Sequence, residues 1–159
     1  MAAAPGTDSA QSASLRPQSI LFACTFNSVR SPMAEGLGRR LFGRDIYFAS
    51  VGVRGGEADP FAIAAMEEIG IDIADHVSIG FDDLDDTSFD LIITLSPEAH
   101  HAALEFTRNL ATRVIYWPTL DPTAVQGARE TILDAYRGVR DGLQQRIKEF
   151  LGWHPVGST

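Results

Sequence analysis

The arrangement that most restricts the fold of this chain is a short apolar run followed at once by the only cysteine of the sequence. Residues 20–23 are apolar, Cys24 comes next, and five residues separate Cys24 from Arg30. Pro32 then begins a segment of helical composition, and proline suits a first helical position because the N–H that it lacks is unpaired there. The pattern predicts a buried strand, a tight loop and a helix.

A loop between a strand and a helix N-terminus is suited to binding oxyanions. Its backbone N–H groups and the positive end of the helix dipole converge on one place, where phosphate, arsenate or sulfate binds. Arg30 supplies two parallel N–H donors for the same anion. Its charge and the helix dipole also favour the thiolate of Cys24, which is the nucleophilic form. A buried, inert cysteine is the alternative, but the order of the surrounding residues favours function.

Two polar residues complete this loop. We expect Ser31 to donate a hydrogen bond to the sulfur of Cys24, which favours the thiolate. Asn27 lies in the middle of the loop, where asparagine suits a positive φ or a side chain that ties the loop backbone together.

Four short apolar runs alternate with helical segments along the chain. The expected strands are residues 19–23, 46–50, 89–95 and 113–117, and the expected helices are 32–41, 60–69, 97–107 and 128–151. This alternation predicts an α/β fold with a four-stranded parallel sheet and helices on both faces. In such sheets ligands bind beyond the carboxyl ends of the strands, where Cys24, Ser50 and Asp121 fall.

The last expected helix carries apolar residues at spacings of three and four. This stripe predicts a face that packs on the core rather than a cofactor site. Its members are Ile132, Tyr136, Val139, Leu143, Ile147 and Phe150.

Composition fits one domain. The 159 residues are 45% hydrophobic, which suffices for an ordinary core. We expect a disordered leader at residues 1–18, a domain at 19–151 and a C-terminal tail at 152–159. The leader has no apolar run, so we expect neither a signal peptide nor a membrane span. The net charge of -8 argues against nucleic-acid and anionic-membrane partners.

The count of cysteines limits redox and metal chemistry. A single cysteine excludes an internal disulfide and fits the reducing cytoplasm. We expect no metal site, because there is no second cysteine and the adjacent His100 and His101 point to different faces of a helix. We expect this histidine pair to lie at the surface.

The loop resembles that of the low-molecular-weight protein tyrosine phosphatases and of the related thioredoxin-coupled arsenate reductases. Their motif, Cys-x-Gly-Asn-x-Cys-Arg-Ser, follows the first strand, and the resemblance here extends over about residues 19–151. The matching positions are Cys24, Asn27, Arg30 and Ser31, with Ser50 and His76 as the residues that support the loop asparagine and Asp121 as the general acid before Pro122. The resemblance implies oxyanion binding by Thr25, Phe26, Asn27, Ser28, Val29 and Ser31.

The implied reaction has two steps and uses no metal or other cofactor. Cys24 attacks phosphorus while Asp121 protonates the leaving oxygen, and the phosphocysteine is then hydrolysed with Asp121 as the base. Arg30 and the loop amides stabilise the equatorial oxygens.

The chain departs from the motif at several positions. Phe26 replaces the loop glycine, so the loop is built differently there or Phe26 faces outward as a pocket wall. Val29 replaces the second loop cysteine, and Ser96 lies where the reductases have a resolving cysteine. Thr123 replaces the aromatic residue that phosphatases place after Asp-Pro, so either Phe26 or Trp117 lines the pocket or the substrate is not an aryl phosphate.

Three functions remain open at this stage. The first is a phosphomonoester hydrolase that acts on a phosphorylated small molecule or a phosphotyrosine protein. The second is an arsenate reductase with one cysteine that uses an external thiol such as glutathione, mycothiol or a glutaredoxin, because an internal disulfide relay is impossible. The third is a non-catalytic module that binds phosphate or arsenate.

Overall fold

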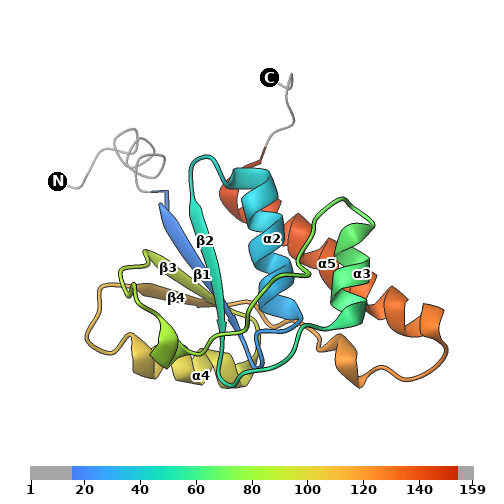
Figure 1. The fold of residues 1–159 in the computed structure, drawn as a ribbon. Coiled ribbons are helices and arrows are strands. Elements are labelled where there is room, and N and C mark those ends of the chain that lie inside the picture. Colours follow the sequence, from blue (N-terminus) through green and yellow to red (C-terminus); the bar gives the residue numbers. More distant parts are fainter. Residues whose placement is uncertain (1–15, 154–159) are drawn as a thin grey trace.

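Strands and helices alternate along the chain in the computed structural model, which describes residues 16–153 (Figure 1). The elements are β1 (Ser19–Cys24), α2 (Arg30–Phe42), β2 (Tyr47–Gly52), α3 (Pro60–Glu67), β3 (Leu91–Thr94), α4 (Pro97–Phe106), β4 (Arg113–Tyr116) and α5 (Arg129–Leu151), with short 3-10 turns at Phe81–Asp83 and Pro122–Ala124. Most of the expected leader and tail, residues 1–15 and 154–159, lies outside the described residues.

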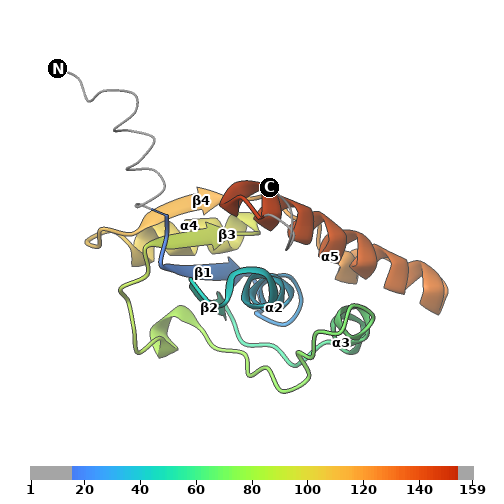
Figure 2. The same cartoon turned by 90° about the horizontal axis from the view of Figure 1, so that it is seen from above.

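The four strands form one parallel sheet in the order β2-β1-β3-β4. Helices α2 and α5 cover one face and α4 covers the other (Figure 1 and Figure 2). Alternate residues of the central strand β1 serve the two faces, because Phe22 packs with the α2 and α5 side whereas Leu21 packs with the α4 side. The predicted fold class is confirmed.

The first helix begins earlier than the proline pattern indicates. Helix α2 starts at Arg30, so Pro32 occupies its third position and not its first. Proline is tolerated there because the N–H groups of the first turn have no partner within the helix. Arg30 and Ser31 thereby become helical residues at the mouth of the loop.

The predicted core-facing stripe of α5 is confirmed except at its end. Tyr136, Val139, Leu143 and Ile147 are buried, whereas Phe150 is 40% exposed and packs with its edge toward Trp117. His100 also differs from expectation, since it is half-buried, forms a 2.9 Å hydrogen bond with Thr94 and stacks on Tyr116.

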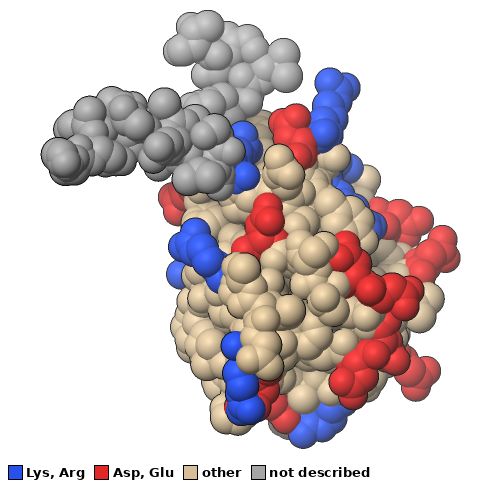
Figure 3. Space-filling view, turned by 90° about the vertical axis from the view of Figure 1, so that its left-hand side faces the viewer, with Lys and Arg blue, Asp and Glu red and all other residues tan. Residues whose placement is uncertain are grey.

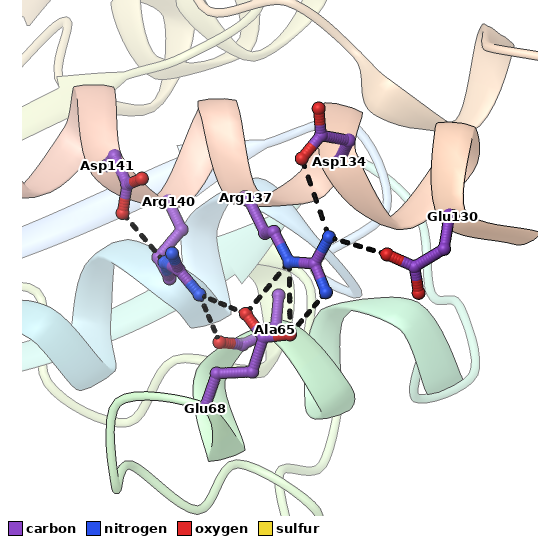
Figure 4. A network of polar contacts seen from close by, with 7 residues as sticks. All are labelled: Ala65, Glu68, Glu130, Asp134, Arg137, Arg140 and Asp141. Atoms are coloured by element: carbon purple, nitrogen blue, oxygen red, sulfur yellow. Dashed lines mark hydrogen bonds and ion pairs between the residues drawn. The ribbon is translucent and has the colours of Figure 1, made fainter.

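A charged network fastens the end of α3 to α5 (Figure 4). The carboxylate of Glu68 accepts hydrogen bonds from Arg137, at 2.7 Å from Nη2, and from Arg140, at 2.8 Å from Nη1. Arg140 also donates to the carbonyl of Ala65 at 2.7 Å. The hydrogen bonds from the two arginines lower the pKa of Glu68 to about 2.

Acidic residues outnumber basic ones in the chain, 21 to 13. On the face in Figure 3, acidic side chains gather along one side and basic side chains are dispersed, in keeping with the net charge of -8. Within residues 16–153, no helix combines the length and the apolar character needed to cross a membrane.

Candidate active site

The loop after β1 forms an open cradle at the carboxyl edge of the sheet. The backbone N–H groups of residues 25–29 donate no hydrogen bond to any other described residue. Cys24 lies beneath them with 2% of its surface exposed, and the backbone N–H of Ser31 approaches its sulfur at 3.4 Å. Unpaired amides at a helix N-terminus are suited to bind a tetrahedral oxyanion.

Asn27 holds the loop in shape. It is fully buried and is the described non-glycine residue with a positive φ, at 56°. Its Nδ2 donates to the hydroxyls of Ser31 at 2.9 Å and Ser50 at 3.0 Å. Its Oδ1 lies 3.0 Å from His76 Nε2 and accepts from the backbone N–H of Ile79 at 3.0 Å. Because Oδ1 only accepts, His76 carries its proton on Nε2.

The hydroxyl of Ser31 lies 2.9 Å from the sulfur of Cys24. Since Ser31 already accepts from Asn27, its own proton is available to the sulfur or to the carbonyl of Val51 at 3.3 Å. Donation to the sulfur stabilises the thiolate.

A buried carboxylate that the sequence analysis did not single out ends this chain of contacts. Glu35, 7% exposed, accepts a hydrogen bond from Ser50 at 2.5 Å and pairs with Arg39 at 2.6 Å. Its Oε1 also lies 4.0 Å from Nδ1 of His76. The available signal was an acidic residue one turn before an arginine on a helix, which more often marks a surface pair.

Arg30 links the cradle to the loop that carries the expected acid. Its Nη1 donates to the carbonyl of Thr119 at 3.0 Å, and its Nη2 lies 4.0 Å from Oδ2 of Asp121. The guanidinium is almost completely buried, whereas the carboxylate of Asp121 is 44% exposed. An exposed carboxylate beside an arginine at the mouth of the cradle is suited to exchange protons with a ligand.

Thr123 orients this carboxylate. Its backbone N–H and its hydroxyl both donate to Oδ1 of Asp121, at 3.0 and 2.7 Å. Oδ2 thus remains directed toward Arg30 and the cradle. The residue that replaces the expected aromatic side chain therefore holds Asp121 in place.

Tyr136 connects α5 to the start of α3, next to the loop that carries Asp121. Its hydroxyl donates to Oδ2 of Asp59 at 2.9 Å, while Oδ1 of Asp59 caps α3 by accepting from the N–H groups of Phe61 and Ala62. Burial, the hydrogen bond to Asp59 and the charges of Asp59 and Asp121 raise the pKa of Tyr136. Tyr136 therefore stays a proton donor to Asp59.

Phe26 does not disrupt the loop. The positive φ falls on Asn27, so position 26 needs no glycine, and the ring faces outward with 47% of its surface exposed. Space for the loop backbone comes from Gly52, where a side-chain carbon would lie 2.7 Å from the nitrogen of Asn27.

Trp117 is not a pocket wall, which corrects one of the two possibilities raised by the sequence. It is 4% exposed and packs in the core against Phe22, at 6.4 Å between ring centroids, and against Phe150, at 5.5 Å. The tryptophan follows β4 on the side that faces α5, so its bulk fills the core.

Ser96, which lies where the reductases have a resolving cysteine, has a structural role. Its hydroxyl accepts from Thr25 at 3.0 Å and from the N–H of Ala99 at 3.2 Å, which caps α4. Among residues 16–153, no three histidine, cysteine, aspartate or glutamate side chains form a group that could hold a metal ion.

Comparison with known proteins identifies the family. The family described as low molecular weight phosphotyrosine protein phosphatase matches residues 19–151. The chain belongs to this family. The match spans every strand and helix described above, from the first residue of β1 to the last of α5.

Relatives of this phosphatase-family protein include enzymes that are named arsenate reductases. Arsenate reductase of Halalkalibacterium halodurans is 36% identical over 131 residues, covering 82% of this chain and 93% of that protein. Arsenate reductase of Bacillus subtilis is 34% identical over 131 residues, with the same coverage of 82% and 93%.

Solved structures similar to this family member include both kinds of enzyme. An arsenate reductase in its phosphate-binding state has a TM-score of 0.71 at 28% identity, covering 85% of this chain and 97% of that one. A low molecular weight protein tyrosine phosphatase from T. tengcongensis has a TM-score of 0.71 at 25% identity, covering 85% and 98%. Family membership therefore establishes an enzyme of the superfamily that includes these phosphatases and arsenate reductases.

Proposed function

We propose that the protein hydrolyses phosphomonoesters, either of small molecules or of phosphotyrosine proteins, through a phosphocysteine at Cys24. One observation carries this proposal: Arg30 contacts the loop of Asp121 while it adjoins the cradle above the sulfur of Cys24. A nucleophile, an anion-binding arginine and a carboxylic acid are the groups that this hydrolysis needs.

In the first step, the Cys24 thiolate attacks phosphorus in line with the leaving oxygen. The S–P bond forms as the P–O bond breaks, and Asp121 gives its proton to the departing oxygen. In the second step, water attacks phosphorus and passes a proton to Asp121, and the S–P bond breaks to release inorganic phosphate and the thiolate. Arg30 and the amides of residues 25–29 bind the equatorial oxygens throughout.

A second candidate is reduction of arsenate with an external thiol, which the names of the relatives at 34–36% identity favour. The Cys24 thiolate would displace a hydroxyl group of arsenate, which would leave as water with a proton from Asp121, to form an S–As bond. An external thiolate would then attack the sulfur of Cys24, and arsenic would leave with the electron pair as arsenite. The resulting disulfide between Cys24 and the external thiol would require a second thiol for its reduction.

One preparation of enzyme can separate the two functions. Hydrolysis of para-nitrophenyl phosphate without added thiol supports the hydrolase. Arsenite formation from arsenate that depends on glutathione, mycothiol or a glutaredoxin supports the reductase. Thioredoxin alone should not sustain arsenate reduction, because Cys24 is the only cysteine of the chain. A preparation with neither activity would overturn both candidates in favour of simple oxyanion binding.

A further inference from the structure

A second cavity lies beside the cradle, between the loop after β2 and helix α4. Its volume is about 640 Å³. Val53 and Ser78 line it and also bond to the cradle loop, because the N–H of Val53 donates to the carbonyl of Cys24 at 3.1 Å and the hydroxyl of Ser78 donates to the carbonyl of Phe26 at 3.0 Å. One layer of backbone therefore separates the cavity from the cradle.

The rim between the cavity and the cradle is low at Gly55. This residue is exposed and lines the cavity. A side-chain carbon built on Gly55 would meet no atom within 4 Å beyond its chain neighbours. The space at Gly55 therefore gives a substrate bound in the cradle a route into the cavity.

Apolar side chains line part of the cavity. Phe81 of the 3-10 turn and Phe106 at the end of α4 form an aromatic pair, with 5.1 Å between the ring centroids. Both residues are half-buried, so each ring keeps some exposed surface. Such surface is stabilised by contact with apolar groups and by a cation over the face of a ring.

Carboxylates line another part of the cavity. They belong to Asp82, Asp83 and Glu105. Glu105 is paired with Arg108 at 2.6 Å. Within residues 16–153, neither Asp82 nor Asp83 forms an ion pair. The two aspartates therefore give the cavity a negative charge that no described side chain neutralises.

Arg54, the cation among the described residues that line the cavity, is already paired. It forms an ion pair with Glu98 at 2.5 Å, which raises the pKa of Arg54 and lowers the pKa of Glu98. Its guanidinium also lies 5.9 Å from the ring centroid of Phe26. The charge of Arg54 is thus balanced by Glu98, which leaves the cavity suited to a cation.

A lysine or arginine side chain matches this lining. Its methylene stem fits against the rings of Phe81 and Phe106, and its charged end fits beside the aspartates. We propose that the cavity binds a lysine or arginine side chain near the phosphorylated residue of a phosphotyrosine protein. This inference rests on the proposed hydrolase function. An exposed ion pair together with a cation–π contact corresponds to a preference of about 3- to 10-fold.

Phosphotyrosyl peptides that carry a single lysine test this preference. The lysine is moved through the positions on both sides of the phosphotyrosine. Each peptide is compared with its norleucine counterpart, which keeps an unbranched apolar stem without the charge. At a restricted set of positions we expect the wild-type kcat/KM to be about 3- to 10-fold higher for lysine, and the ratio to fall as salt is added.

Two variants of the cavity should lower this ratio. Asp82→Asn removes a charge at an exposed position, and Phe106→Leu keeps an apolar side chain but removes a ring. Each should reduce the ratio of lysine to norleucine by about 2-fold. Asp85→Asn is the matched control, because Asp85 belongs to the same acidic run but does not line the cavity, so this variant should keep the wild-type ratio. Circular dichroism checks that each variant is folded.

Several results would overturn the inference. A wild-type ratio near one at every position would do so, and so would a ratio below one, which would mean that an apolar side chain occupies the cavity. The same lysine preference at all positions, or an equal fall in Asp82→Asn and Asp85→Asn, would indicate attraction by the overall charge of the chain. If Phe106→Leu does not fold, an unchanged ratio in Asp82→Asn decides against the cavity. Self-association of the wild type that is lost in Asp82→Asn would show that a second copy covers the cavity instead.

Failure of the proposed function gives a different result. If the wild type hydrolyses para-nitrophenyl phosphate but none of the peptides, this inference is wrong and the hydrolase function stands. If it hydrolyses neither, the hydrolase proposal is wrong. Calorimetric affinities for peptides with phosphonomethylphenylalanine in place of phosphotyrosine then compare lysine with norleucine without turnover. Equal affinities at every position would overturn the part assigned to the cavity.

Discussion

Ser50 donates a 2.5 Å hydrogen bond to the buried carboxylate of Glu35. Because an ionised carboxylate only accepts, the proton of Ser50 is committed to it, and Ser50 must accept from Nδ2 of Asn27. The other Nδ2 proton goes to Ser31, which leaves the Ser31 proton for the sulfur of Cys24 or for a carbonyl. Glu35 thus sets the direction of the hydrogen bonds that end at the nucleophile.

Glu35→Gln should impair both stability and turnover. Loss of the charge weakens the bonds to Ser50 and Arg39, which should lower the free energy of unfolding by about 1–3 kcal/mol and kcat by about 10-fold. Urea denaturation and hydrolysis of para-nitrophenyl phosphate measure the two effects. Glu67→Gln on exposed helix surface is the matched control, and equal behaviour of the two variants would contradict the role of Glu35.

Cys24→Ser should abolish hydrolysis while the protein stays folded. The substitution removes the thiolate and changes little volume at a buried position, so we expect turnover to fall by more than about 10³-fold. Steady-state kinetics and thermal unfolding are the measurements. Comparable rates in the variant and the wild type would exclude a covalent mechanism through Cys24.

Arg30→Lys should be nearly as damaging as Arg30→Ala. Lysine keeps the charge but lacks the planar pair of parallel donors, which in Arg30 is fixed by the hydrogen bond to Thr119. We expect both variants to lose about 10²–10³-fold in kcat/KM for a phosphate monoester. A lysine variant that keeps most of the wild-type rate would show that charge alone suffices.

Asp121→Asn should slow esters with poor leaving groups more than those with good ones. Alkoxides need a proton in order to depart and nitrophenolate does not, so loss of about 10²–10⁴-fold is expected for alkyl phosphates and much less for para-nitrophenyl phosphate. The measurement is kcat across a series of leaving groups. If kcat falls by the same factor for all substrates, Asp121 is a structural turn residue and the general acid lies elsewhere.

The network around Glu68 should make stability depend on acid pH. The pKa of Glu68 in the folded protein is about 2, below its ordinary value of 4.5, so the ionised carboxylate stabilises the fold. This contribution is fully present above about pH 4.5 and is lost as the pH falls toward 2. In urea titrations, Glu68→Gln should be less stable than wild type at pH 6, and the difference should shrink below about pH 4.5 and be small near pH 2. A difference that does not change with pH would contradict this assignment.

Much of the fold could be predicted from the sequence because the sequence patterns that indicate it are local. Apolar runs of strand length alternate with helical segments, which suffices for a parallel α/β sheet. The cysteine, the arginine and the residues between them occur in one stretch, so the order of residues predicts the loop that joins β1 to α2. The start of α2 was misplaced because Pro32 is tolerated anywhere in the first turn.

The contacts that surround the cradle were harder to predict from the sequence because they join distant segments of the chain. Glu35 reads as one member of a surface pair until β2 places Ser50 against it. Trp117 could have lined the pocket or filled the core, and only the packing of α5 decides between these. Neither the approach of Arg54 to Phe26 nor its pairing with Glu98 follows from sequence spacing.

The side chain of Asn27 also makes the shape of the cradle depend on contacts between distant segments of the chain. It bonds to Ser50 on β2 and to Ile79, which lies 52 residues further along the chain. These segments must all be assembled before the amides around Asn27 can converge. If the helices were formed but the hydrogen bonds of Asn27 to Ser50 and Ile79 were broken, circular dichroism would report native helix content. Such a chain would have no oxyanion site. We call these contacts of Asn27 the junction. Loss of activity at lower urea concentration than loss of helix would therefore report local opening of the junction.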